Sequence, residues 1–178
     1  NDKAQTFHVR PSIQTEATDA TDADHEIPSC SESAITDSVH MEGLYVGASY
    51  SLVGTLVDGV SGEELKDEGG QSLSQSMTFT ARSSTESHVL EFRLPAHVGG
   101  SSVVVFERLM RNGRPVANHC DVSDPSQTLV RPSIHTEAAL KGGGRERQAD
   151  ASETVTDRVS FEGLHARREY RLVGVLVD

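Results

Sequence analysis

The sequence has no tryptophan, few other aromatic residues, only two cysteines, and fewer basic than acidic side chains. Aromatic residues make up 4% of the 178 residues, so a core must be built mainly from Val, Leu and Ile. The 16 Lys and Arg against 27 Asp and Glu give a net charge of −11. This charge argues against nucleic-acid binding, which needs a positive surface to neutralise phosphates. It suits a soluble surface that repels its own copies.

Long apolar runs are also missing. No stretch is long enough to cross a bilayer, and the chain begins neither with Met nor with a signal peptide. We therefore expect an internal piece of a longer protein, without membrane insertion in this segment. The cysteines, Cys30 and Cys120, permit one disulfide without requiring it. Two free thiols are an equally good expectation.

Several motifs occur twice at a nearly constant offset. Val-Arg-Pro-Ser-Ile begins at Val9 and again 121 residues later, at Val130. The pair Gln-Thr precedes each copy, at Gln5 and at Gln127. Two further motifs return after 120 residues, namely Ile35-Thr-Asp37-Ser-Val39 as Val155-Thr-Asp157-Arg-Val159, and Tyr50-Ser-Leu-Val-Gly54 as Tyr170-Arg-Leu-Val-Gly174. A unit of this length has the size of a domain, not of a solenoid repeat.

The offsets predict how the chain is divided. Residues 9–130 form one complete repeat, residues 1–8 are the tail of a preceding repeat, and residues 131–178 are the N-terminal part of the next one, truncated. Apolar and polar residues alternate with period two throughout the complete repeat, which is typical of strands. The strand candidates lie at 11–17, 35–41, 52–57, 77–81, 88–94, 102–109, 115–122 and 127–131. About seven or eight short strands without a helical period predict an antiparallel β-sandwich. The polar segments 18–34 and 140–154 are expected to be mobile loops.

Three polar residues fall on apolar faces of these strands. Asp37 lies two positions from Ile and Val and shares their face, Glu107 likewise shares a face with Val and Leu, and Thr15 with Ile and Ala. An ionised carboxylate in an apolar interior is costly, so each acid must be neutral, paired or hydrogen-bonded. Two acids that meet tend to share a proton. The alternative is that either acid lies at a sheet margin and reaches water. His119 has apolar neighbours on both faces of its strand, so its direction stays open.

Seven motifs occur in a recognisable order along the complete repeat. They are Pro11-Ser-Ile-Gln-Thr15-Glu-Ala17, Ile35-Thr-Asp37, Glu42-Gly-Leu44, Tyr50-Ser-Leu-Val-Gly54, Val104-Val-Phe-Glu107, Val116-Ala-Asn-His119-Cys-Asp121 and Gln127-Thr128. In this order they resemble the VaFE repeat, also described as the Thr–Gln ester-bond domain of Gram-positive surface adhesins and pilus-like stalks. The resemblance covers the whole first repeat and the start of the second.

This resemblance implies an immunoglobulin-like sandwich that cross-links itself. Thr15 on the first strand would form an intramolecular ester with Gln127 on the last strand, with loss of ammonia. The catalytic acids and histidine of the family fall on Asp37, Glu107 and His119. Either His119 or Glu107 would accept the hydroxyl proton. The reaction happens once per molecule, so the chain is not expected to be an enzyme, and it needs no cofactor and no metal.

The truncated repeat carries part of the same pattern. Thr136 and Asp157 match the motif, but no matching Glu, His or Gln follows within the sequence. Gln5 likewise lacks its Thr. Residues 131–178 are therefore expected to be poorly ordered alone, unless the Gln5 strand or a neighbouring molecule completes them.

The resemblance implies a structural stalk segment of an extracellular, cell-wall-anchored adhesin, whose partners are the neighbouring repeats of the same chain. An adhesive module without a cross-link, in which loop 18–34 binds a host ligand, is the main alternative. A hydrolase built from Thr15, His119 and Glu107 is a weaker one, because no Gly-x-Ser-x-Gly motif is present.

Two further kinds of site are less well supported by the sequence. A Lys–Asn isopeptide bond needs a buried lysine, and Lys66, the only lysine of the complete repeat, lies in a predicted turn. A metal site built from His119, Asp121 and Asp124 has a nonspecific spacing, and solvated loop acids are the simpler interpretation. A disulfide between Cys30 and Cys120 is compatible with an ester, because Cys120 should face away from His119.

Overall fold

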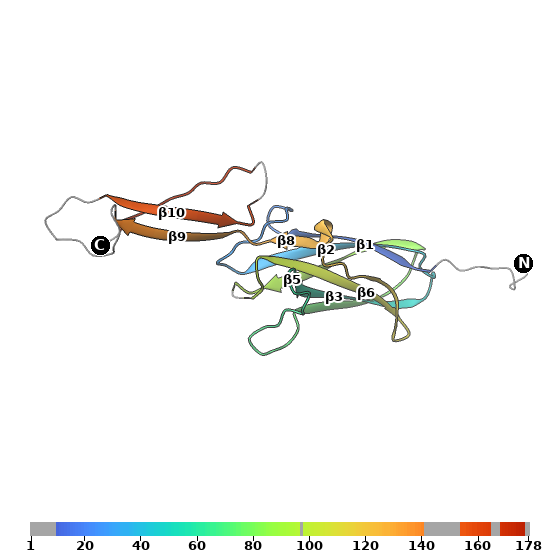
Figure 1. The fold of residues 1–178 in the computed structure, drawn as a ribbon. Coiled ribbons are helices and arrows are strands. Elements are labelled where there is room, and N and C mark those ends of the chain that lie inside the picture. Colours follow the sequence, from blue (N-terminus) through green and yellow to red (C-terminus); the bar gives the residue numbers. More distant parts are fainter. Residues whose placement is uncertain (1–9, 97, 141–153, 165–167, 177–178) are drawn as a thin grey trace, which may run out of the picture. The chain divides into compact units, whose positions relative to one another are not determined.

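The computed structural model describes residues 10–96, 98–140, 154–164 and 168–176, and Figure 1 shows their strands. Contacts divide the chain between Arg131 and Pro132 into two compact units. The predicted tail at residues 1–8, with Gln5, lies outside the described residues, as does most of loop 140–154. No helix among the described residues is long and apolar enough to cross a membrane.

The first unit is an antiparallel β-sandwich, which confirms the predicted fold class. One sheet has the order β1-β2-β5 and the other has the order β4-β3-β6-β7, with β8 also paired to β6. The strands are β1 (Ser12–Asp19), β2 (Ser33–Glu42), β3 (Ser49–Asp58), β4 (Ser74–Thr80), β5 (Thr85–Leu94), β6 (Ser102–Arg111), β7 (Arg114–His119) and β8 (Thr128–Val130). A short 3-10 turn, η2 (Pro125–Gln127), precedes β8.

The core between the two sheets follows from the alternation in the sequence. Along β2, buried and more exposed residues alternate at every position, and Ile35, Val39 and Met41 are completely buried. Their counterparts on the second sheet include Leu52 and Leu56. Aliphatic residues make up most of this core, as the low aromatic content requires.

Loop 18–34 is held in place, contrary to the expectation of a mobile loop. The Ile27 side chain is 1% exposed. The Ile27 N–H donates to the Val130 carbonyl at 2.9 Å, and the Val130 N–H donates to the His25 carbonyl at 2.7 Å. One apolar residue in a polar stretch therefore fastens the loop to β8, the last strand of the unit.

The second unit contains one hairpin, of β9 (Ser133–Leu140) and β10 (Val155–Glu162). Its register pairs Thr136 with Val159, just as β1 and β2 pair Thr15 with Val39. Residues 168–176 have no regular secondary structure. Apolar side chains of the hairpin stay exposed, for example Phe161 at 45%. The hairpin thus repeats the start of the first unit without an opposing sheet among the described residues.

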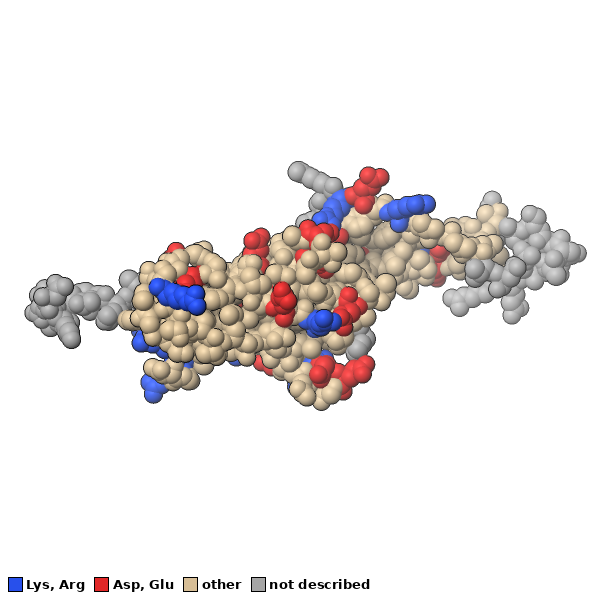
Figure 2. Space-filling model, turned by 180° about the vertical axis from the view of Figure 1, so that it is seen from behind, with Lys and Arg blue, Asp and Glu red and all other residues tan. Residues whose placement is uncertain are grey.

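Charged side chains of both signs are interspersed on the face drawn in Figure 2, where acidic and basic groups form no large single-signed patch.

Candidate functional site

The site lies where β7 ends and β8 begins. Both strands pair with β6, but His119 at the end of β7 lies opposite Glu107, and Thr128 at the start of β8 lies opposite Val104. The chain between them leaves the edge of β6 and returns through η2. β1 contacts β7, η2 and β8 at this point. The first and last elements of the unit are therefore neighbours.

Four predicted residues meet in the interior beside this junction. Thr15 is 8% exposed, and Asp37, Glu107 and Gln127 are completely buried. Asp37 and Glu107 point inward as their alternation indicates. Gln127 belongs to η2 and not to the predicted last strand. The 3-10 turn lies against β1, which brings the Gln127 side chain to Thr15. The polar group is thus enclosed within an otherwise aliphatic core.

The Thr15 hydroxyl is the centre of this group. Its oxygen lies 2.9 Å from His119 Nδ1 and 3.3 Å from Glu107 Oε2. Gln127 Nε2 is in direct contact with the same oxygen. A hydroxyl has one proton to donate, and the nearer acceptor is His119. The arrangement joins a nucleophile, a base and a carboxamide at one atom.

The second nitrogen of His119 has a carboxylate partner that the sequence analysis did not assign to this role. His119 Nε2 lies 2.7 Å from Asp124 Oδ2. The Asp124 carboxylate accepts a hydrogen bond from the His119 Nε2–H, which leaves Nδ1 free to accept from Thr15. Thr15, His119 and Asp124 are therefore connected as in the triads of hydrolases.

Asp124 is itself fixed as the N-cap of η2. Its Oδ1 accepts from the Ser126 N–H at 2.8 Å and from the Ser126 hydroxyl at 2.7 Å. These hydrogen bonds, the hydroxyl first, lower the pKa of Asp124. A signal in the sequence could have found this residue, because Asp precedes Gln by three positions in both copies, at Asp2 and at Asp124.

Burial dominates the charge state of the two interior acids. The pKa of Glu107 is raised to about 10, chiefly by burial and next by the neighbouring Asp37, against a lowering by the Thr15 hydroxyl. Burial also raises the pKa of Asp37 to about 6, although Glu107, Gln127 and His119 each lower it. Burial and the mutual repulsion of the two carboxylates therefore favour a pair that holds one proton near neutral pH. The site therefore contains a carboxylic acid able to donate at neutral pH.

Some buried polar atoms of the site have no hydrogen-bond partner within normal distance and angle among the described residues. They are both carboxylate oxygens of Asp37, Glu107 Oε1 and Gln127 Oε1. Unpaired buried polar groups are costly, so a cluster of them requires an explanation. Here they surround the carboxamide that Thr15 contacts.

A family model, the T-Q ester bond containing domain, matches residues 11–131 and again residues 132–178. The chain belongs to this family. Two crystal forms of an adhesin from Mobiluncus mulieris, which contains intramolecular disulfide, isopeptide and ester bond cross-links, have a similar fold. The TM-scores are 0.57 and 0.58 at 14% and 13% identity, covering 86% of this chain and 77% or 76% of the adhesin chain. Curated protein sequences give no match.

The second match to the T-Q ester bond domain holds only part of the site. Thr136 and Asp157 lie on the β9–β10 hairpin and are exposed. They occupy the same register positions as Thr15 and Asp37 in the first match. No described residue of the second unit supplies the Glu, His or Gln.

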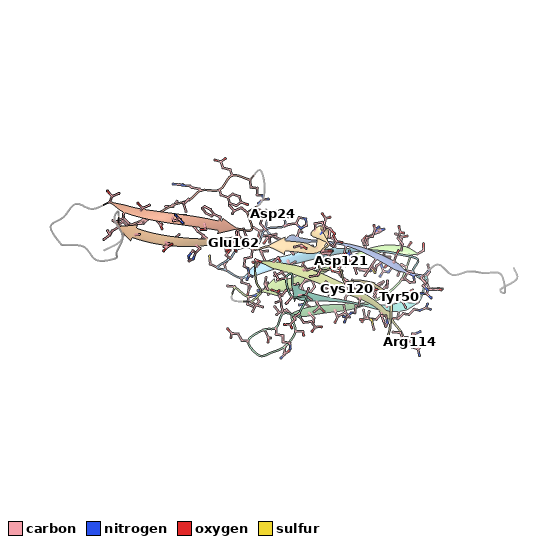
Figure 3. All side chains as sticks on the ribbon, viewed as in Figure 1. Asp24, Tyr50, Arg114, Cys120, Asp121 and Glu162 are labelled. Carbon is pink, nitrogen blue, oxygen red and sulfur yellow. The ribbon has the colours of Figure 1, made fainter. Side chains whose placement is uncertain are left out.

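Other predicted residues lie apart from the centre of the T-Q domain. Cys30 and Cys120 are free thiols in the structure, Cys30 exposed and Cys120 half-buried. The Cys120 thiol lies 3.7 Å from the Glu107 carbonyl. Cys120 and Asp121, labelled in Figure 3, follow directly after β7. Asp121 accepts from Ser123 and not from His119.

The remaining alternatives have little support in the T-Q domain. Lys66 is exposed, whereas an isopeptide bond needs a buried lysine. The described residues contain no group of three or more His, Cys, Asp or Glu arranged to hold a metal ion. The carboxylate of Asp124 is used to orient His119.

Proposed function

We propose that residues 9–130 are a structural stalk domain of a bacterial cell-surface adhesin, cross-linked by an ester between Thr15 and Gln127. The main support for this ester is that the buried Thr15 oxygen contacts both His119 and the Gln127 carboxamide. Membership of the T-Q ester bond family supports the chemistry. The similar fold of the Mobiluncus adhesin supports the role, since that adhesin contains ester bond cross-links. The proposal includes an extracellular, cell-wall-anchored location and neighbouring repeats as partners.

In the first step, the Thr15 oxygen attacks the side-chain carbonyl carbon of Gln127. The hydroxyl proton passes to His119 Nδ1, which is closer than Glu107. The Asp124 carboxylate accepts from the His119 Nε2–H, which fixes the imidazole ring and stabilises the imidazolium that forms. Because both reactants are fixed on neighbouring elements, the reaction is intramolecular and has a high effective concentration.

The carbonyl oxygen of Gln127 gains negative charge in this step. It is buried without a hydrogen-bond donor in the structure. Glu107 keeps its proton because burial raises its pKa, so it can donate to this oxygen as the tetrahedral intermediate forms. Asp37, whose pKa is raised by burial but lowered by the Gln127 side chain, is the ionised carboxylate that can accept from the amide nitrogen during the reaction.

In the second step, His119 returns its proton to the Gln127 nitrogen. The carbon–nitrogen bond breaks, ammonia leaves, and the carbonyl re-forms as an ester. One hydroxyl and one carboxamide thus give one ester and one ammonia. Burial of Thr15 and Gln127 keeps water away from the product and slows its hydrolysis. The same burial disfavours turnover of an external substrate, so the reaction is a single self-modification and not enzyme catalysis.

The intact mass of the chain tests this function. The mass should fall short of the sequence mass by one ammonia, and tandem mass spectrometry should join the peptides that contain Thr15 and Gln127. Thr15→Ala should remove the deficit. A full sequence mass for the folded parent chain would refute the proposal.

A further inference from the structure

The Gln-Thr pair occurs twice in the sequence, and the proposed ester uses only its Gln. In both copies an Asp stands three residues before the pair, at Asp2 before Gln5-Thr6 and at Asp124 before Gln127-Thr128. Asp124 orients His119, and Gln127 is the electrophile. Thr128 is the member of this recurring set without a role.

The Thr128 hydroxyl closes the turn that holds both of these residues. It donates to the Asp124 carbonyl at 2.7 Å, and the Gln127 N–H donates to the same carbonyl at 3.2 Å. The Thr128 N–H donates to the Pro125 carbonyl. Thr128 also begins β8 and pairs with Val104 on β6. Its side chain therefore ties the start of the turn to a position fixed by the sheet.

Resting on the proposed function, we propose that Thr128 is a positioning residue for ester formation, acting through the bond between its hydroxyl and the backbone of Asp124. Without this bond, the Asp124 carbonyl keeps only the Gln127 N–H among its described partners, and that contact lies within the turn itself. The Asp124 side chain then loses its fixed place 2.7 Å from His119 Nε2. A displacement of about 1 Å at such a site can cost about 100-fold in rate.

Thr128→Val tests this role, because valine keeps the shape of the side chain and removes only the hydroxyl. The full chain is made by cell-free synthesis, translation is stopped, and samples are quenched in acid denaturant for intact-mass analysis. Ammonia loss should slow at least about 10-fold in Thr128→Val, and Thr128→Ser should react within about 3-fold of the parent. Thr55→Val is the control. Thr55 is half-buried on β3, and its hydroxyl makes no hydrogen bond among the described residues.

A second measurement separates positioning from a general loss of stability. Asp124→Asn removes the carboxylate charge but keeps the backbone carbonyl that Thr128 contacts. If Thr128 acts through Asp124, adding Thr128→Val to Asp124→Asn should slow the reaction by less than about 3-fold. Circular dichroism at the assay temperature checks that each variant is folded. If Thr128→Val does not fold, Thr128→Ala is used in its place, because it removes the same hydroxyl.

The outcomes distinguish this inference from the proposed function. If the parent never loses ammonia, both are wrong. If the parent reacts and Thr128→Val reacts at the parental rate, only the role of Thr128 is wrong. Equal slowing by Thr128→Val and Thr128→Ser would also overturn it, as would fully multiplicative effects of Thr128→Val and Asp124→Asn.

Discussion

Preventing the cross-link should change the stability of the first unit by an amount that its loop length sets. The proposed ester joins residues 112 positions apart. Closing a loop of that length lowers the entropy of the unfolded chain and stabilises the fold by about 5 kcal/mol, on the relation used for disulfides. For a domain of about 120 residues this corresponds to a shift of about 20 °C in Tm.

Thr15→Val is the matching perturbation, because it removes the nucleophilic oxygen and keeps the side-chain shape. It also leaves buried polar atoms of Glu107 and Gln127 without a contact, which adds about 1–3 kcal/mol. Equilibrium unfolding in guanidinium chloride should therefore show a loss of at least about 5 kcal/mol. Thr15→Ser keeps a hydroxyl and serves as the control.

The slope of the unfolding transition distinguishes a lost covalent tie from lost contacts. A tied unfolded chain exposes less surface, so the parent should have a smaller m-value than Thr15→Val. Lost contacts alone would change the midpoint and leave the slope unaltered. The argument would be refuted if parent and variant had equal m-values and if their unfolding free energies differed only by the amount expected for the lost contacts. This holds whatever the mass spectrum shows.

Three other changes have expected outcomes. Asp124→Asn should slow ammonia loss about 10²–10⁴-fold in a time course of cell-free synthesis. Asp121→Asn is the control and should react at the parental rate, because among the described residues the Asp121 carboxylate accepts only from Ser123. Equal rates for both variants would contradict the triad. Burial raises the pKa of Glu107 from 4.5 to about 10, so the unfolding free energy of an uncross-linked variant should fall as pH rises through this range. Glu107→Gln should flatten that pH dependence, and an unchanged profile would contradict a neutral Glu107. Gly54→Ala should destabilise the fold by about 1–3 kcal/mol, because its new Cβ would lie 2.6 Å from the Phe92 ring; a Tm equal to that of the parent would show that the sheets can move apart.

The strands and the interior acids could be predicted from the sequence because both depend on a local period. A residue two positions from Ile35 and two from Val39 must face the core once the strand is packed, so Asp37 was assigned without knowledge of its partners. The same argument placed Glu107. His119 could not be oriented in this way, because β7 is an edge strand whose side chains are exposed or half-buried on both faces. Its contact with Thr15 depends on a neighbouring strand distant in sequence.

Composition alone predicts that Asp124 is a solvated acid and that loop 18–34 is a mobile polar segment. The role of Asp124 arises from its place as the N-cap of η2, where one carboxylate oxygen points back at the end of β7. The order of the loop arises from the buried Ile27 side chain and its pairing with Val130. Neither the N-cap position of Asp124 nor the burial of Ile27 follows a strand period. The sequence signals the role of Asp124 only through the recurrence of Asp three residues before Gln-Thr.

The position of the proposed ester determines how a pulling force would cross the domain. In the proposed stalk, force would enter near Pro11 and leave near Arg131, and the joined residues lie only a few positions inside these points. Unfolding an untied chain between Thr15 and Gln127 would release 112 residues, or about 370–400 Å of extended chain. With the ester in place, the force passes from β1 to η2 through covalent bonds, so the sandwich between them carries almost none of it. The hydrogen bonds of the sheets then need to withstand only thermal unfolding. A modest aliphatic core with few aromatic residues is therefore sufficient for the proposed stalk domain.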